Sequence, residues 1–403
     1  MTWRNLSFWL KPGIRVKRYF ALAAGGFLLA LLGASLWPEH PAAALFVVVG
    51  AGVLVLGVRA MNRSVLSALT DPDRVPQLVY RRRVLARGPR VVAFGGGTGL
   101  SRLLKGLKGL TGNTTAVVAT TDDGGSTGRL RREFAVPAVG DLVDCLAALS
   151  EAPRAPELMG YRFPRGEGLK GHTCGNLFLV ALFDLSGDFA EAMRSANRIL
   201  ALAGAVWPST PEPARLRAEL ADGRVVEGET ALREAGGRVV RLGLVPEDPA
   251  VMTEVEEAIR EAELLVLGPG SLFTSVIASL LPRRVREAVA TSPAPLVQVV
   301  NIMTEPGETD GMDAFDHVRA LAEHLGRWPD VVLVHTAPLP PEVLTRYAAE
   351  GQRPVAFDPA PFRRMGIRVL TGDFRERGPL AQHDPERLAR VLASLVDLEG
   401  APV

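Results

Sequence analysis

The chain has 403 residues, of which 47% are hydrophobic, 22% charged and 6% aromatic, a globular balance that excludes wholesale disorder. Its two cysteines, Cys145 and Cys174, exclude a disulfide framework and a cysteine-based zinc site. Residues 1–90 carry 13 Lys and Arg against three acids, net +10, whereas the other 313 residues carry 33 against 41, net −8. The acidic bulk argues against nucleic-acid binding, which needs a basic surface.

Two apolar runs predict a membrane anchor in residues 1–58. Residues 19–37 carry no charge, and residues 42–58 follow after a short polar break. Both runs are near the length that crosses a bilayer, so they predict a transmembrane hairpin of two helices, about 19–37 and 42–58, in contact with membrane lipids. A cleaved signal peptide or two buried helices of a soluble domain are the alternatives.

The charges around the hairpin predict its orientation. Lys and Arg flank both apolar runs on the outside, and the connecting loop has none. The positive-inside rule therefore predicts a cell-membrane protein with two spans, in which both termini and the main domain are cytoplasmic. Residues 59–89 are expected to form a basic juxtamembrane linker, either drawn to anionic headgroups or simply solvated.

From residue 90 to about 395, short apolar strands alternate with helices. Strands are expected at 91–94, 115–120, 264–267, 296–300 and 331–334, with helical spacing of apolar residues in between. This α/β alternation predicts a doubly wound, mainly parallel sheet, in which ligands bind at the carboxyl ends of the strands. Three shorter runs around an Asp222-Gly223 turn predict a small β insertion at about 205–246.

A glycine-rich loop, Gly95-Gly96-Gly97-Thr98-Gly99-Leu100-Ser101, joins the first strand to a helix. Glycines let a ligand approach the backbone, and the free N–H groups at a helix start attract an anion. The loop departs from the dinucleotide fingerprint because Arg102 occupies the third glycine position, and no Gly-Lys-Ser/Thr follows. Phosphate binding is expected here, with a purely structural tight turn as the alternative.

The second strand ends in the loop Thr121-Asp122-Asp123-Gly124-Gly125-Ser126, followed by Arg129. Paired carboxylates at a strand end can hold Mg²⁺ or ribose hydroxyls, and arginine can pair with phosphate. Asp122 and Asp123 are therefore candidate metal ligands and candidate catalytic residues. The alternative is a surface loop whose charged groups pair with one another and bind no ligand.

Two further loops open apolar helices. Asp141 could be a helix N-cap or a ligand contact. In Gly171-His172-Thr173-Cys174-Gly175-Asn176, Thr173 could act as a cap, while His172 and Asn176 could face a ligand. The two cysteines are expected to be buried and inert.

Two more loops follow later strands. Gly268-Pro269-Gly270-Ser271 leads into a helix, which is again an anion-binding geometry. The segment from Asn301 to Gly311 gathers three acids and includes Thr304. Several such loops at the strand ends of one sheet are stronger together than any one alone.

The combined motifs resemble the gluconeogenesis factor family (YvcK-like), which is related to 2-phospho-L-lactate transferase (CofD-like). GGGTGLS, TDDGGSTGRLR, GHTCGN, GPGSLFTS and NIMTEPGETDG occur in this order, and the resemblance covers about residues 90–395. It implies a Rossmann-like nucleotide-binding core. It also implies a UDP-sugar ligand such as UDP-N-acetylglucosamine, and a regulatory role in carbon flow, cell-wall synthesis and cell shape.

The candidate ligand-binding residues are Gly96, Gly97, Thr98, Gly99, Leu100, Asp123, Gly124, Gly125, Ser126, Arg129, Asp141, His172, Asn176, Gly268, Pro269, Gly270, Ser271, Asn301 and Thr304. One motif departs from the family, because Val143 and Asp144 replace its usual Arg and Asn. Ligand contacts from those two positions are therefore not carried over.

The alternative function is a Mg²⁺-dependent, phospholactate-type transferase that moves a group from a nucleotide donor to a hydroxyl acceptor. A nicotinamide-dependent oxidoreductase is disfavoured by the missing third glycine, and a scaffold without a nucleotide is the remaining alternative. Cell-wall synthesis proteins and a second copy of the chain are candidate partners. The sequence leaves the base, the sugar and the regulated partner open.

Overall fold

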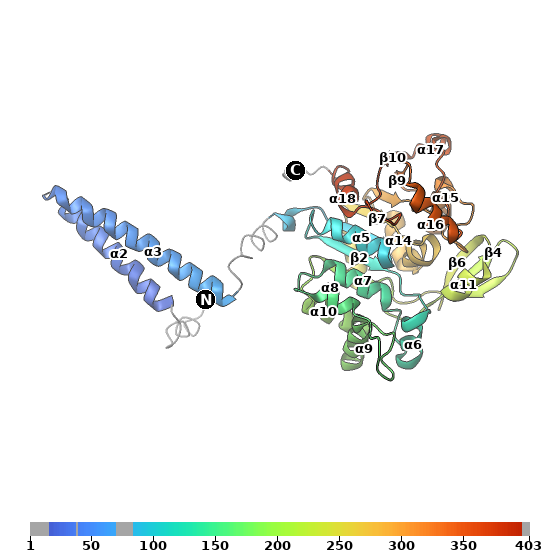
Figure 1. Ribbon diagram of the computed structural model, residues 1–403, viewed down its shortest axis with the longest axis horizontal. Helices are drawn as coiled ribbons and strands as arrows, with labels where there is room; N and C mark the ends of the chain where they lie inside the picture. The colour runs from blue at the N-terminus through green and yellow to red at the C-terminus, as the bar shows by residue number, and fades with distance from the viewer. Residues whose placement is uncertain (1–15, 38, 70–83, 397–403) are drawn as a thin grey trace. The chain divides into compact units, whose positions relative to one another are not determined.

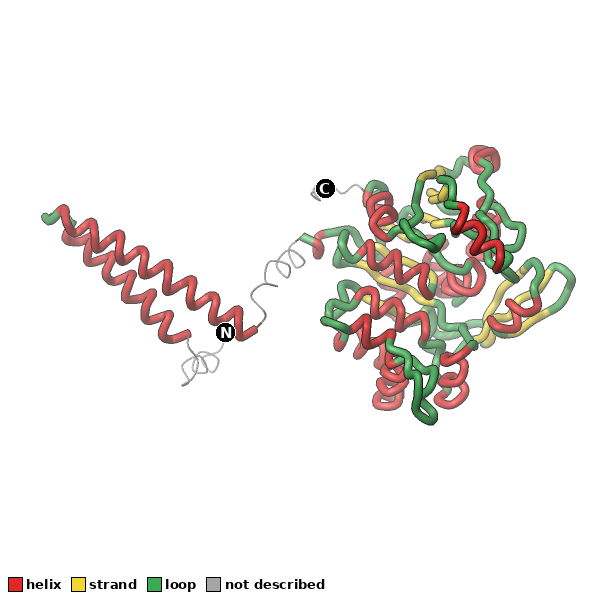
Figure 2. The backbone as a smooth tube through the Cα atoms, in the orientation of Figure 1, coloured by secondary structure: helices red, strands yellow, loops and turns green. Residues whose placement is uncertain are grey.

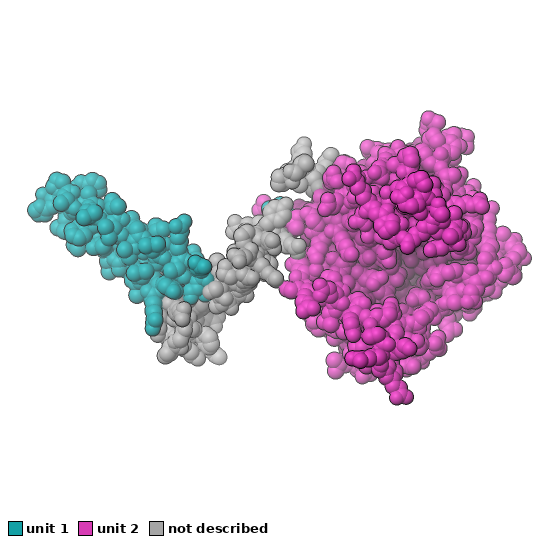
Figure 3. All heavy atoms as spheres, in the orientation of Figure 1, with its two compact units in different colours: residues 1–84 teal, residues 85–403 magenta. Residues whose placement is uncertain are grey.

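The computed structural model describes residues 16–37, 39–69 and 84–396, which fall into two compact units divided after Val84 (Figures 1 and 3). Lys11, Arg15 and the Arg81-Arg82-Arg83 cluster lie outside the described residues. The first unit holds helix α2 (Val16–Leu36), the 3₁₀ turn η1 (Pro41–Ala43) and helix α3 (Ala44–Leu69).

The hairpin of α2 and α3 packs small residues inward and large apolar residues outward. A Cβ added at Gly26 would lie 2.4 Å from the backbone N of Leu54, and one at Gly50 would lie 2.4 Å from the backbone N of Ala30. Phe20, Leu28 and other large side chains are exposed. Helices of mean hydropathy 1.9 and 2.4 could each cross a membrane, by length and composition.

Helix α3 runs past the predicted end of the second span. Residues 59–69 continue the helix instead of beginning a linker, because that stretch contains neither glycine nor proline to stop it. The predicted linker is therefore helical in its first third, and residues 70–83 lie outside the described residues.

The second unit contains a seven-stranded sheet of order β10-β9-β8-β7-β1-β2-β3, in which each strand is parallel to its neighbours. Figure 2 draws the strands in yellow. This confirms the predicted Rossmann-like, doubly wound α/β fold. Its strands are β1 (Val91–Gly95), β2 (Thr114–Val118), β3 (Ala205–Pro208), β7 (Leu264–Leu267), β8 (Leu296–Val299), β9 (Val331–His335) and β10 (Arg368–Gly372).

Helices cover both faces of this sheet because alternate strand residues point to opposite sides. Val91 and Ala93 of β1 pack in the cluster of α5, α7 and α18, whereas Val92 and Phe94 pack in that of α12, α13 and α14. The helices of this unit are α5 (Gly97–Leu107), α6 (Gly125–Phe134), α7 (Gly140–Leu149), α8 (Ala155–Gly160), α9 (Cys174–Ser186), α10 (Phe189–Ile199), α12 (Thr253–Arg260), α13 (Ala278–Leu280), α14 (Arg283–Thr291), α15 (Ala314–Leu325), α16 (Pro341–Ala349), α17 (Pro359–Met365) and α18 (Pro385–Ala393), with a 3₁₀ turn η3 (Leu85–Arg87) and a π-helix η4 (Leu272–Ile277).

The insertion is a three-stranded antiparallel sheet of order β5-β4-β6. It contains β4 (Arg215–Leu220), β5 (Val225–Glu227), helix α11 (Glu229–Ala235) and β6 (Val239–Val245), seen at one edge of the domain in Figure 1. Its start is later than predicted, because β3 pairs with β2 in the main sheet. A histidine joins it to the core: the N–H of Leu242 donates to Nε2 of His324 over 3.0 Å.

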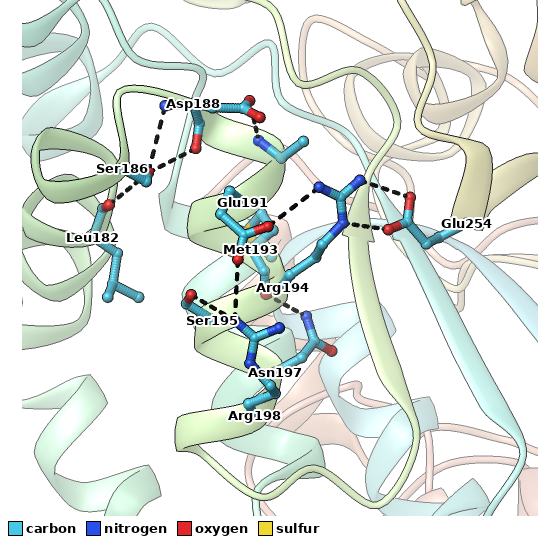
Figure 4. A network of polar contacts seen from close by, with 11 residues as sticks. Leu182, Ser186, Asp188, Glu191, Met193, Arg194, Ser195, Asn197, Arg198 and Glu254 are labelled. Atoms are coloured by element: carbon cyan, nitrogen blue, oxygen red, sulfur yellow. Dashed lines mark hydrogen bonds and ion pairs between the residues drawn. The ribbon is translucent and has the colours of Figure 1, made fainter.

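Asn197 on α10 contacts the edge of the main sheet at β3. Figure 4 shows Asn197 on this helix together with Arg194 and its partners Glu191 and Glu254. Asn197 binds both backbone groups of Val206: its Nδ2 donates to the carbonyl over 2.9 Å, and its Oδ1 accepts from the N–H over 2.9 Å. Arg194 of the same helix forms ion pairs with Glu191 and with Glu254 of α12. The free edge of β3 is thereby partly satisfied by side chains.

Candidate functional site

A cavity of about 520 Å³ opens at the carboxyl ends of the strands. It lies where β1 pairs with β2 on one side and β7 on the other, which is the switch point at which open α/β sheets bind ligands. Its lining comes from the loops after β1, β2, β7, β8, β9 and β10 and from the insertion: Gly96, Gly97, Thr98, Gly99, Arg102, Asp122, Asp141, Glu229, Arg233, Pro269, Gly270, Ser271, Ser275, Asn301, Ile302, Met303, Glu305, Tyr347, Gln352, Ala381, Gln382 and His383.

The glycine loops after β1 and after β7 both line this cavity and lie in close contact with each other. A Cβ on Gly99 would lie 2.4 Å from the carbonyl O of Pro269, so only glycine lets α5 begin this close to the β7 loop. The peptide bond between Gly268 and Pro269 is cis. Of the candidate residues in these loops, Gly96, Gly97, Thr98, Gly99, Pro269, Gly270 and Ser271 line the cavity, whereas Leu100 and Gly268 do not.

Asp141 lies against the glycine loop, where a Cβ on Gly96 would lie 2.1 Å from its carboxylate. It is not an N-cap: α7 begins at Gly140 with Val139 in the cap position. Burial, then the carboxylates of Asp122 and Asp144, raise its pKa to about 7, and a hydrogen bond from the Gly97 backbone opposes the rise. Asp141 thus occupies part of the anion-binding geometry of the loop.

The adjacent acids Asp122 and Asp123 point to different partners. Asp122 lines the cavity, and its Oδ1 accepts from the N–H of Gly124 over 2.9 Å. Asp123 does not line it; its Oδ1 accepts from the N–H and the hydroxyl of Thr230 on α11, over 3.0 and 2.7 Å.

Of the two carboxylates predicted as metal ligands, only Asp122 lines the cavity, where it is joined by Asp141, Glu229 and Glu305. Within the described residues, no three His, Cys, Asp or Glu side chains are grouped as a complete metal site. Two carboxylates still fit Mg²⁺, which is commonly held by one or two carboxylates together with ligand phosphates.

Helix α11 of the insertion contributes two residues that the sequence analysis missed, Glu229 and Arg233. Nη2 of Arg233 lies 2.8 Å from Oε1 of Glu229. Burial, and next the charge of Asp122, raise the pKa of Glu229 to about 8. Apolar periodicity does not indicate this helix, because its seven residues lie between two predicted strands.

The loop after β8 adds a hydrogen-bonded cluster at the other glycine loop. Nδ2 of Asn301 donates to the carbonyl of Gly270 over 2.9 Å and to Oε1 of Glu305 over 3.1 Å. The hydroxyl of Ser271 donates to Oε2 of Glu305. Burial and the neighbouring Glu308 raise the pKa of Glu305 to about 7. Thr304 is instead buried and bound to the backbone of Arg353.

The opposite arm of the cavity is formed by segments after β9 and β10. Tyr347, Gln352, Gln382 and the buried His383 line it together with Met303. Arg102, at the third position of the glycine motif, donates to the carbonyl of His383 over 2.9 Å and pairs with Glu376. Arg102 is the residue by which the sequence departs from the dinucleotide motif, and its contacts hold the segment that contains Glu376 and His383.

Ser126, His172 and Asn176 form a separate cluster that does not line the cavity. Oγ of Ser126 lies 2.8 Å from Nδ1 of His172 and accepts from Nδ2 of Asn176 over 3.1 Å. Burial, then Arg129, lower the pKa of His172. Thr173 caps α9 by accepting from the N–H of Asn176, as one alternative predicted. Gly124, Gly125 and Arg129 also lie outside the cavity lining.

Comparison with known proteins assigns the family. Residues 91–375 match the family model described as 2-phospho-L-lactate transferase CofD. The gluconeogenesis factor of Bacillus subtilis is 41% identical over 315 residues, covering 77% of this chain and 99% of its own. A relative of the same family name from Deinococcus radiodurans is 43% identical over 426 residues, covering 98% of this chain and 90% of its own.

A solved structure agrees with these matches. The crystal structure of a Bacillus halodurans protein superposes with a TM-score of 0.74 at 39% identity, covering 76% of this chain and 99% of that one. The order of the sequence motifs, the CofD-like fold and relatives that match along most of the chain lead to one conclusion. The chain belongs to the gluconeogenesis factor family, with a CofD-like domain.

Proposed function

We propose that this protein is a membrane-tethered regulator that binds a nucleotide sugar of the UDP-N-acetylglucosamine type and links carbon metabolism to cell-wall synthesis and cell shape. One observation carries the proposal: a single cavity at the switch point of the sheet joins the two glycine loops to two further groups of side chains. One group, the acidic arm, consists of Asp122, Asp141 and Glu229, and the other, the amide arm, contains Gln352 and Gln382. A nucleotide sugar has the same order of parts, with a diphosphate between a base and a sugar. The family name of the relatives supports a regulator.

Mg²⁺ fits the acidic arm as a companion of the diphosphate. Asp122 and Asp141 would hold it, since both line the cavity beside the glycine loop. The cation would offset the repulsion between a phosphate and the Asp141 carboxylate, which already accepts from the Gly97 backbone.

The hairpin supports a membrane location for this regulator. Its large apolar side chains face outward while glycines form the helix–helix contact, which is the reverse of a soluble two-helix unit. Only 17% of the apolar stretch of each helix is buried, whereas core helices of a soluble domain would be mostly buried. The tether would keep the regulator beside membrane-bound wall synthesis, with both termini in the cytoplasm.

The match to the CofD family favours a second candidate, a Mg²⁺-dependent transferase of the phospholactate type. In that case the nucleotide donor would occupy the same glycine loops, and an acceptor hydroxyl would enter beside Asp122 and Asp141. The two candidates share the cavity and differ in the nucleotide and in turnover.

Calorimetric titration of the full chain in detergent micelles separates them. We expect saturable binding of UDP-N-acetylglucosamine, weaker binding of UDP, no binding of GTP or NAD, and no product by mass spectrometry. Binding of a guanosine nucleotide only with Mg²⁺, without any uridine nucleotide, would replace the regulator with the transferase.

A further inference from the structure

Helix α11 of the insertion is held tightly over the cavity from two sides. On one side, Thr230 donates twice to Oδ1 of Asp123, and a Cβ on Gly228 would lie 2.3 Å from Oδ2 of the same carboxylate. On the other side, a Cβ on Gly307 would lie 2.6 Å from the carbonyl O of Arg233. The loops after β2 and β8 thus fix the direction in which α11 presents its side chains.

The side chains presented by α11 into the cavity are Glu229 and Arg233. Glu229 is largely shielded, with 14% of its side chain exposed, and among the described residues Arg233 is its ion-pair partner. Its Oε2 is left available for a ligand that donates hydrogen bonds. Carboxylates accept charge-assisted hydrogen bonds from hydroxyl groups, and these bonds are stronger than neutral ones.

The arm on the other side of the glycine loops has a different chemistry. Gln352 and Gln382 supply amide groups that both donate and accept, and Tyr347 supplies an aromatic ring. Such groups match the alternating donors and acceptors of a pyrimidine edge, which carboxylates alone cannot match. The carboxylate of Glu229 instead matches the hydroxyl groups of a sugar ring.

We propose that Glu229, delivered by the β insertion, determines which sugar is bound by accepting hydrogen bonds from its hydroxyls, while the base lies in the Tyr347 arm. This inference rests on the proposed function. It adds the orientation of the ligand in the cavity and the element that recognises its sugar, which is the β insertion. Arg233 acts as a positioning residue, because its ion pair holds the Glu229 carboxylate in the cavity. The insertion is then a specificity element attached to a common nucleotide-binding sheet.

The test compares the affinities of the full chain for UDP-N-acetylglucosamine and for UDP by calorimetry in detergent micelles, at a pH above 8, where the Glu229 carboxyl, whose pKa is about 8 in the ligand-free chain, is largely ionised. We expect Glu229→Gln to weaken UDP-N-acetylglucosamine at least tenfold and UDP less than twofold, because only the sugar would lose a charged acceptor. Glu227→Gln is the matched control, since Glu227 is exposed, belongs to the same insertion and does not line the cavity. It should leave both affinities unchanged. Gln382→Ala should weaken both ligands by the same factor.

Two results would overturn the inference alone. One is wild-type binding of the nucleotide sugar with an unchanged ratio of the two affinities in Glu229→Gln. The other is a lower affinity of Gln382→Ala for UDP-N-acetylglucosamine with an unchanged affinity for UDP, which would place the sugar, and not the base, beside Gln382. Absence of any UDP-N-acetylglucosamine binding by the wild-type chain would instead refute the proposed function, and this inference with it.

Discussion

At the scale of single residues, the cavity is defined by carboxylates that come from distant parts of the chain. Asp122 and Asp141 both follow β2, Glu305 follows β8 and Glu229 belongs to the insertion, yet all four line one cavity. Three of them have a pKa raised to about 7 or 8, chiefly by burial. Such shifts are typical of functional sites, because a ligand or cation that enters can stabilise the charged forms.

The raised pKa of Glu229 predicts how stability depends on pH. A carboxyl whose pKa rises from 4.5 to about 8 on folding stabilises the protein below pH 4.5, and the contribution is lost as the pH rises through 8. We expect the ligand-free chain to lose on the order of 1–3 kcal/mol between pH 5 and pH 9 from this group. Melting temperatures across that range should fall less in Glu229→Gln than in the wild type.

The control for this experiment is Glu227→Gln, which should keep the wild-type slope because that side chain is exposed. A residual slope is expected in Glu229→Gln, since Asp141 and Glu305 titrate in the same direction. If Glu229→Gln kept the whole slope, its carboxyl would not be the titrating group.

The neighbours Asp122 and Asp123 offer a second residue-scale prediction. Asp122→Asn should abolish the gain in UDP-N-acetylglucosamine affinity that Mg²⁺ provides, because Asp122 lines the cavity. Asp123→Asn should keep that gain, because Asp123 binds Thr230 instead. Titrations with Mg²⁺ and with a chelator measure both. Loss of the Mg²⁺ effect in Asp123→Asn alone would place the metal at Asp123 and not at Asp122.

At the scale of elements, the strongly patterned parts could be predicted from the sequence. Five of the seven strands of the main sheet, the two apolar helices and the turn at Asp222-Gly223 follow from apolar periodicity and glycine placement, whereas the edge strands β3 and β10 were not predicted. Helix α11 did not, because seven residues between two strands give too short a pattern. The choice between Asp122 and Asp123 also escaped prediction, since neighbouring residues share a loop and tertiary contacts alone decide their direction.

The motif Gly171-His172-Thr173 shows a different limit of the sequence. Its position at a helix start was correctly predicted, but His172 turns to Ser126 rather than into the cavity. A family motif marks residues that matter together, and it does not say which of them contact a ligand and which hold a loop.

The hairpin gives a prediction with a matched control. Gly26→Leu should separate the two apolar helices, because a Cβ there would lie 2.4 Å from the backbone of Leu54. Gly25→Leu makes the same chemical change one residue earlier, where a Cβ meets nothing within 4 Å. Energy transfer between dyes at the open ends of α2 and α3, measured in micelles, should fall only in Gly26→Leu. An equal response from both variants would contradict the packing described.

At the scale of the whole molecule, the α/β domain and the apolar two-helix hairpin are separate units. The B. subtilis relative matches almost all of its own length to 77% of this chain, so the family domain occurs without an equally long N-terminal segment.

Removal of residues 1–84 should therefore leave a folded domain, because that domain has its own core. We expect the fragment to be monodisperse without detergent and to bind UDP-N-acetylglucosamine with the affinity of the full chain. Light scattering and calorimetry check the two parts. Aggregation of the fragment would mean that the apolar helices belong to the core of the α/β domain. The prediction of a membrane anchor would then be wrong.

The central claim is that a nucleotide sugar occupies the cavity between the β1 and β7 loops. Hydrogen–deuterium exchange of the full chain, with and without saturating UDP-N-acetylglucosamine, tests it most directly. We expect slower exchange in peptides covering residues 95–102, 228–235 and 268–275, which meet at the cavity. Protection confined to residues outside these three segments, or none at saturation, would contradict the account.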